Sequence, residues 1–188
     1  LKNSSQKADR QVFFDHIKKL NLRNSIFVDN TANEDIAAEY NRFLEHNIGV
    51  VTCNKIACAS TLSNYKELKK TARKFGTPFL FETNVGAGLP VIDTLNNLIA
   101  SGDEIHKIQA ILSGSLNFVF NKFTSKNSFE SVVKSAQKEG YTEPDPKIDL
   151  SGVDVARKIL ILARESGFEL NLEDIENQSF LPQEVLDT

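Results

Sequence analysis

Three short apolar segments alternate with two amphipathic segments along the first half of the chain, and this alternation constrains the fold most strongly. The predicted strands are residues 25–29, 48–52 and 79–82, and the predicted helices between them are 34–46 and 62–74. Strands that alternate with helices over short connections form parallel sheets. The sequence therefore predicts an α/β domain, preceded by a helix over 10–20 and with Asn33 as the N-cap of helix 34–46.

Helices outnumber strands after Gly86-Ala87-Gly88, which indicates a second domain of α+β type starting near residue 86. One strand is predicted over 105–113. The predicted helices are 91–101, 116–123, 129–139 and 154–166, and glycines 140 and 167 end the last two.

The composition excludes several classes of protein. Hydrophobic residues make up 40% of the 188-residue chain and charged residues 25%, and no apolar run approaches the length of a membrane span. The 22 basic and 25 acidic residues show no basic cluster that would bind nucleic acid. No targeting segment is visible, so we expect a soluble, cytoplasmic protein. Cys53, Cys58 and the scattered histidines do not form a zinc ligand set, and we interpret both cysteines as reduced, buried thiols.

Two loops are candidates for function. Gly86-Ala87-Gly88 follows a strand and opens a helix, but Val91 stands where the dinucleotide fingerprint has its third glycine. The glycines then mark either a tight structural turn or a backbone that a ligand or ion approaches. The segment 140–149 is interpreted as a stiff loop in which two prolines hold three carboxylates, and the alternative is a solvated Pro-rich turn.

Two lysines are candidates for chemistry. Asp154 and Lys158 are four residues apart on one helix face, and an exposed ion pair is the favoured interpretation. The alternative is a proton-donating lysine in a carboxylate-rich site. Asn54-Lys55 follows a predicted strand at the edge where α/β sheets bind ligands, although a surface lysine is equally compatible.

Several motifs together resemble homoserine dehydrogenase over nearly the whole chain. The most specific is GYTEPDPKIDLSGVDVARK at 140–158. The others, in the family's order and spacing, are VDNTAN (28–33), VVTCNKIA (50–57), ETNVGAGLPVI (82–92), ILSGSLNFVF (111–120) and LNLEDIENQSFLP (170–182). The forms NVGAGLPVI, LSGSL and ILARESG are similar to the bifunctional type, in which the dehydrogenase follows an aspartate kinase on the same parent chain.

This resemblance implies NAD- or NADP-dependent interconversion of L-aspartate 4-semialdehyde and L-homoserine, in the pathway to threonine and methionine. Lys158 would be the acid/base that protonates the substrate oxygen, and Lys55 a second lysine near the nicotinamide and the substrate. The resemblance implies three further sets of residues. The substrate-binding set is Glu143, Asp149, Asp154, Tyr141, Gly114 and Ser115. The cofactor-binding set is Asn30, Thr31, Ala32, Lys55 and Gly140. The set for a monovalent cation such as sodium, bound mainly through backbone carbonyls, is Glu82, Val85, Ala87 and Leu89.

The resemblance assigns residues 1–85 to an incomplete Rossmann-type nucleotide-binding domain and 86–188 to a substrate and dimerisation domain, so a homodimer or higher homo-oligomer is expected. Cys53 replaces the family's usual proline, Ile148 its usual aspartate and Ser115 a frequent threonine. The chain starts with Leu and contains no Met, so we expect a fragment whose glycine-rich pyrophosphate loop precedes Leu1. Two alternatives remain: a non-catalytic binding or dimerisation module, and a dehydrogenase acting on another amino-acid semialdehyde.

Overall fold

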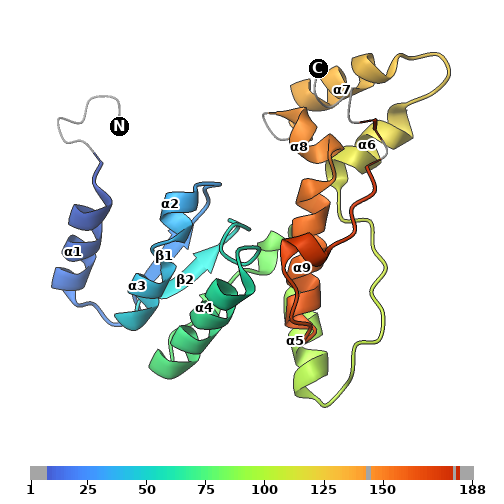
Figure 1. Cartoon of the computed structure of the whole chain (residues 1–188). Coiled ribbons are helices and arrows are strands. Elements are labelled where there is room, and N and C mark those ends of the chain that lie inside the picture. The colour runs from blue at the N-terminus through green and yellow to red at the C-terminus, as the bar shows by residue number, and fades with distance from the viewer. Residues whose placement is uncertain (1–7, 143–144, 180, 183–188) are drawn as a thin grey trace. The chain divides into compact units, whose positions relative to one another are not determined.

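The computed structural model describes residues 8–142, 145–179 and 181–182. The chain forms two compact units, coloured along the sequence in Figure 1. Unit 1 contains Leu1–Ala57 and Ser63–Phe81, and unit 2 contains Cys58–Leu62 and Glu82–Thr188. The short segment Cys58–Leu62 thus belongs to unit 2 although unit 1 surrounds it in the sequence, an arrangement that the order of apolar and amphipathic segments does not predict.

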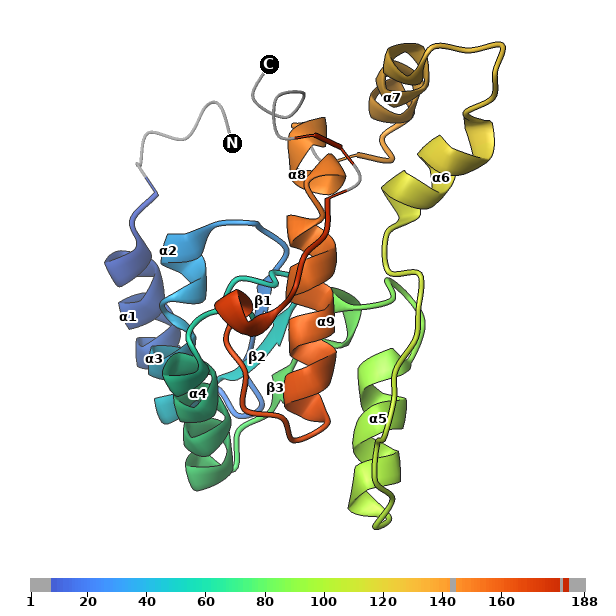
Figure 2. The ribbon, with the colours of Figure 1, turned by 45° about the vertical axis from the view of Figure 1, so that its right-hand side comes forward.

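Unit 1 contains a parallel sheet with strand order β1-β2-β3 (Figure 2). The strands are β1 (Ile26–Asp29), β2 (Gly49–Thr52) and β3 (Phe79–Leu80), and Val51 of β2 is in register with Val28 on one side and Leu80 on the other. The prediction of a parallel α/β fold is confirmed. Because the strands run in parallel, their carboxyl ends meet at one edge of the sheet.

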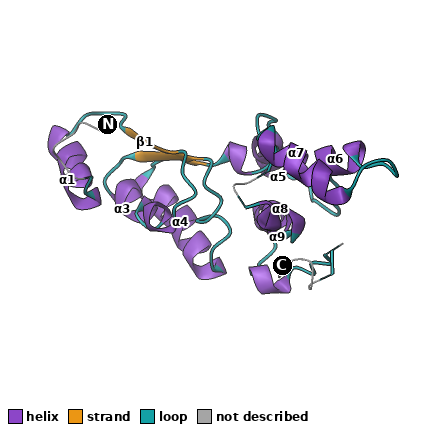
Figure 3. Cartoon of the chain, turned by 90° about the horizontal axis from the view of Figure 1, so that it is seen from above, coloured by secondary structure: helices purple, strands orange, loops and turns teal. Residues whose placement is uncertain are grey.

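In the described part of unit 1, four helices accompany this sheet. They are α1 (Arg10–Leu20), α2 (Glu34–Ala37), α3 (Tyr40–Glu45) and α4 (Leu62–Phe75). The predicted helix 34–46 is two helices, because the chain turns at residues 38–39, and Asn33 caps the first of them as predicted. Seen along the sheet, α3 and α4 lie on the same side of the strands (Figure 3).

An aromatic and aliphatic core fills the space between these helices and the sheet. Tyr40, Phe43 and Leu44 of α3 are buried, as are Val50 of β2 and Phe79 of β3. The Phe27 and Phe43 rings stack with centroids 4.2 Å apart. Burial of each such side chain stabilises the fold by about 1.5–3 kcal/mol relative to exposure, so this core fixes the position of the strand ends.

Unit 2 is built around the helix α9 (Val153–Glu165), whose residues Leu160, Ile161 and Leu162 are all buried. A helix buried on more than one face lies inside its domain. The other elements of unit 2 are the 3-10 helix η1 (Glu82–Asn84), α5 (Val91–Ala100), α6 (Gly114–Lys122), α7 (Phe129–Lys138), α8 (Pro146–Leu150) and the 3-10 helix η2 (Leu172–Asp174). No helix in the described ranges has the length and apolar character required to cross a membrane.

Three further predictions are corrected by the structure. The predicted strand 105–113 is wrong: this segment is extended loop, because the described residues of unit 2 offer it no neighbouring strand to bond. The predicted loop 140–149 contains α8, which begins at Pro146 and is capped by the Asp145 side chain. Of the two cysteines predicted to be buried, Cys58 is buried but Cys53 is only half-buried.

Candidate active site

Lys158 lies on α9 and makes two polar contacts within unit 2. Its Nζ lies 2.6 Å from Asp154 Oδ2 and donates to the Leu112 carbonyl oxygen at 2.8 Å. The two side chains are only 16% and 12% exposed, because α9 packs against α5 and α8. The interpretation of Asp154 and Lys158 as an exposed ion pair is therefore wrong.

The contacts of Lys158 leave part of its hydrogen-bonding capacity available. An ammonium group carries three protons. In the part of the chain that the structure describes, Asp154 and Leu112 receive two of them. The third N–H can point to a ligand atom, and the two existing contacts fix its direction.

A second polar group forms at the start of α6. Ser115 Oγ donates to Asp149 Oδ1 at 2.7 Å, and Ser113 Oγ lies 2.9 Å from Ser115 Oγ. All three side chains are buried, with Ser115 5% and Asp149 7% exposed. Ser113 directly follows Leu112, so the segment 112–115 joins the Lys158 contact to the Ser115–Asp149 pair. The structure thus brings together Lys158, Asp154, Ser115 and Asp149, four residues predicted for the site.

The other predicted residues of unit 2 are three substrate residues and the cofactor residue Gly140. Gly114 is the first residue of α6. Tyr141 is exposed and its ring stacks on Phe118 of α6, with centroids 4.2 Å apart. Gly140 has φ +77°, a left-handed conformation that ends α7 and directs the chain to Tyr141. Glu143 lies outside the described residues.

The predicted cofactor residues of unit 1 lie at the carboxyl edge of its sheet. Asn30, Thr31 and Ala32 follow β1 and are exposed, while Lys55 follows β2 and is half-buried. Ligands bind to parallel sheets at this edge. The arrangement suits a nucleotide cofactor, and the side chains that hold these two loops together are buried beneath them.

Asp29, the last residue of β1, organises that buried network. Its Oδ2 accepts from Tyr40 Oη at 2.5 Å and from Asn54 Nδ2 at 3.1 Å, and its Oδ1 accepts from the Thr31 backbone N–H at 2.8 Å. Burial acts to raise the pKa of Asp29, but hydrogen bonds from Tyr40, Thr31 and Asn54 outweigh it, so the pKa lies below its ordinary value. Asn54 Nδ2 also donates to the Asn33 carbonyl oxygen at 3.0 Å. The network therefore ties the loop with Asn30–Ala32 to the loop with Lys55.

The loop predicted to bind a cation is a tight turn. Gly86 and Ala87 have φ +85° and +53°, and a Cβ on Gly86 would lie 2.6 Å from Val91 Cγ2. Both carboxylate oxygens of Glu82 accept backbone N–H groups at the start of α5, from Ile92 at 2.8 Å and from Asp93 at 2.7 Å. The Glu82 side chain therefore serves as a helix cap, and cation binding by the backbone carbonyls of this turn stays a prediction. Among the described residues, no three His, Cys, Asp or Glu side chains form a metal-binding group.

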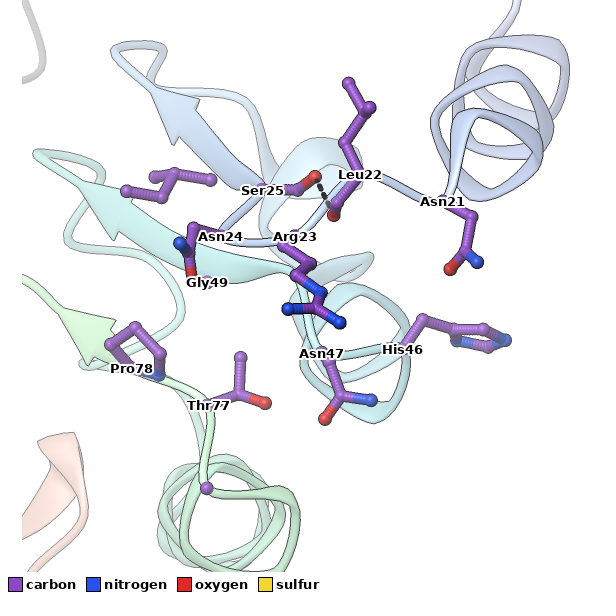
Figure 4. A pocket seen from close by; sticks show the side chains of 12 residues that line it. Asn21, Leu22, Arg23, Asn24, Ser25, His46, Asn47, Gly49, Thr77 and Pro78 are labelled. Carbon is purple, nitrogen blue, oxygen red and sulfur yellow. Dashed lines mark hydrogen bonds between the residues drawn. The ribbon is translucent and has the colours of Figure 1, made fainter.

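A hollow of about 720 Å³ lies in unit 1 at the amino end of the sheet (Figure 4). Its lining includes Arg23, Ser25, His46, Asn47, Thr77 and Pro78. None of the predicted site residues lines it. Because parallel sheets bind ligands at the opposite edge, we do not assign the cofactor to this hollow.

Comparisons with known proteins agree with this arrangement. The family model described as "Homoserine dehydrogenase, NAD binding domain" matches residues 1–82, and the model described as "Homoserine dehydrogenase" matches residues 90–187. The chain belongs to the homoserine dehydrogenase family. The resemblance inferred from the motifs is thereby confirmed.

Individual relatives of the chain are longer than the chain itself. The bifunctional aspartokinase/homoserine dehydrogenase of Haemophilus influenzae is 49% identical over 97% of this chain and 22% of that protein. The homoserine dehydrogenase of Schizosaccharomyces pombe is 44% identical over 86% of this chain and 43% of that protein. A solved hyperthermophilic archaeal homoserine dehydrogenase in complex with NADPH is 28% identical, with a TM-score of 0.69 over 81% of this chain and 49% of that chain. The chain thus spans less than half of each of these proteins.

Several residues that build the site were not singled out from the sequence. Ser113 had a usable signal, because a serine just before a helical segment is a common N-cap. The sequence signal for Asp29 was weaker: it is a carboxylate at the last position of a predicted strand. Tyr40 had none, since its contact with Asp29 depends on the packing of α3 on the sheet.

Proposed function

We propose that this chain is part of a longer polypeptide, here called the parent, that interconverts L-homoserine and L-aspartate 4-semialdehyde with NAD or NADP. The observation that carries the proposal is Lys158, a largely buried lysine held by Asp154 and the Leu112 carbonyl, whose third N–H has no acceptor among the described residues. Family membership and the partial coverage of the relatives support it as well.

In the proposed reaction a bound nicotinamide supplies the hydride that reduces the aldehyde carbon. Lys158 donates its third proton to the aldehyde oxygen as negative charge develops there. Asp154 and the Leu112 carbonyl hold the ammonium group in place for this transfer. In the reverse direction the same nitrogen takes the proton from the hydroxyl of homoserine.

Asp149 and Ser115 would bind the amino group of the substrate. An ammonium group only donates hydrogen bonds, and a carboxylate only accepts them. Glu143, Asp154, Tyr141 and Gly114 complete the proposed substrate set. The cofactor would lie over Asn30–Ala32 and Lys55 of unit 1, with Lys55 contributing positive charge near the nicotinamide. Gly140 of unit 2 stays a predicted cofactor residue.

The proposal extends to the other partners of the site and of the chain. A monovalent cation such as sodium would bind backbone carbonyls of Glu82, Val85, Ala87 and Leu89. The parent would be a homodimer or higher homo-oligomer. An aspartate kinase domain on the same parent is supported by the bifunctional name of the Haemophilus influenzae relative.

The test is NADPH oxidation with L-aspartate 4-semialdehyde, measured for the parent and for the 188-residue chain. We expect the parent to turn over, and its Lys158→Ala variant to lose about 10²–10⁴-fold in kcat because the proton donor is gone, with KM little changed. Lys134→Ala is the matched control, since Lys134 also pairs with a carboxylate four residues away, Glu130, but on an exposed surface.

Each outcome distinguishes the alternatives. A fully active Lys158→Ala parent would contradict the role of Lys158 in proton transfer. A parent that oxidises NADPH only with another amino-acid semialdehyde would contradict the substrate. We expect the 188-residue chain itself to be inactive, as a non-catalytic module would be, so the parent decides between enzyme and module.

A further inference from the structure

Ser113 is a buried serine at the start of α6 that lies outside the predicted substrate, cofactor and cation sets. It is 7% exposed, and its Oγ lies 2.9 Å from Ser115 Oγ. The same Oγ accepts the Leu116 backbone N–H at 3.1 Å, so Ser113 is also the N-cap of α6. It stands between Leu112, which holds Lys158, and Ser115, which contacts Asp149.

The direction of these hydrogen bonds follows from counting protons. Each serine hydroxyl has one proton to donate. Ser115 donates its proton to the Asp149 carboxylate, which can only accept. In the pair formed by Ser113 and Ser115, Ser113 must therefore be the donor. The protons run in one direction, from Ser113 to Ser115 to Asp149.

This order determines what Ser115 can offer to a substrate. Its proton is directed to Asp149, and one lone pair accepts from Ser113. The remaining lone pair can only accept a hydrogen bond. Ser115 and Asp149 then offer only hydrogen-bond acceptors to the substrate. Such a site suits an ammonium group, which donates hydrogen bonds, and not a substrate group that can only accept them.

We propose that Ser113 is a positioning residue that orients the Ser115 hydroxyl as an acceptor and so makes the site selective for a substrate that carries an amino group. The inference rests on the proposed function, because the amino group is that of homoserine and aspartate semialdehyde. Ser113 acts through Ser115 and does not touch the substrate.

The test measures selectivity for the amino group in the parent. The two substrates are L-aspartate 4-semialdehyde and 4-oxobutanoate, which has the same carbon chain without the amino group. The variants are Ser113→Gly, Ser113→Ala and Ser113→Thr. Glycine is tolerated at an N-cap far better than alanine, so Ser113→Gly removes the hydroxyl while it preserves the start of α6. Threonine keeps both the hydroxyl and the cap.

We expect Ser113→Gly and Ser113→Ala to raise KM for L-aspartate 4-semialdehyde about tenfold, the loss expected when one charge-assisted hydrogen bond is misdirected. For both variants, kcat/KM with 4-oxobutanoate and KM for NADPH should change little, and Ser113→Thr should behave as wild type. The control is Ser128→Gly, which removes the exposed N-cap serine of α7 and should leave selectivity unchanged.

Two results would overturn the inference. If Ser113→Gly lowers kcat/KM equally for both substrates, Ser113 only supports the fold of α6. If Ser113→Gly retains wild-type selectivity, the hydroxyl does not orient Ser115. Failure of the proposed function gives a different result from these two. The unaltered parent would then not reduce L-aspartate 4-semialdehyde at all, and the inference about Ser113 would be wrong as well.

Discussion

The Asp29 side chain makes several buried polar contacts in unit 1 and is almost inaccessible to solvent. We expect Asp29→Asn to destabilise the chain by about 1–3 kcal/mol. Tyr40 and Asn54 would lose a charged acceptor, and the new amide N–H group would face one of the groups that now donate to Asp29. Urea unfolding at pH 7 measures the change. Asp35→Asn is the control, since Asp35 is exposed in a surface ion pair, and it should unfold as wild type does.

The lowered pKa of Asp29 predicts that the stability of the folded chain depends on pH. The pKa of Asp29 is lower in the folded chain than the value of about 3.9 for an unfolded aspartate. Its contribution to stability is therefore complete above about pH 4 and is lost as the pH falls through the lower folded value. The difference in unfolding free energy between wild type and Asp29→Asn should thus shrink below about pH 4. A constant difference down to pH 2 would contradict the assignment.

Sequence motifs identified the residues of the site but not their environment. Lys158, Asp154, Ser115 and Asp149 were predicted for the site, and the structure gathers them in unit 2. The burial of the Asp154–Lys158 pair could not be predicted, because spacing along a helix shows which side chains share a face but not which face is covered. Their catalytic roles stay predictions.

At the scale of elements, Glu82 joins the turn at Gly86 to the start of α5. Its carboxylate accepts two backbone N–H groups that the helix itself leaves without partners. We expect Glu82→Ala to destabilise unit 2 by about 1 kcal/mol, the usual cost of losing a cap. Chemical unfolding measures this change. Asn96→Ala, which changes an exposed residue of the same helix, should have no destabilising effect. An equal loss of unfolding free energy in both variants would contradict the capping role.

Helices were more predictable than strands for a physical reason. The bounds of α1, α4 and α9 follow from local periodicity and from end signals such as Gly167. A strand depends on a partner far away in sequence, so the apolar pattern of residues 105–113 was not sufficient to predict one. The helix α8 was missed because Pro146 was interpreted as a loop residue, although proline also suits the first turn of a helix.

At the scale of the whole molecule, the membership of Cys58–Leu62 in unit 2 depends on contacts with α9 and the segment after it. Arg164, itself buried, donates through Nη1 to the Cys58 carbonyl oxygen at 2.8 Å and through Nε to the Leu170 carbonyl oxygen at 3.0 Å. Asn171 Oδ1 accepts the Leu62 backbone N–H at 2.8 Å. Local periodicity cannot predict such an exchange between units, because the contacts join residues more than 100 positions apart.

Arg164→Ala tests whether this arginine holds the segment in unit 2. We expect a loss of about 2–4 kcal/mol in unfolding free energy, because a buried side chain with two charge-assisted hydrogen bonds is removed. Hydrogen exchange should become faster at the amides of residues 58–62 than at those of α3, since only the former lose their anchor. The control is Arg157→Ala, which changes a half-exposed residue of the same helix. It should alter neither the unfolding free energy nor the hydrogen exchange of residues 58–62. Equal acceleration at α3 and at residues 58–62 would mean that Arg164 supports general stability and does not anchor the segment.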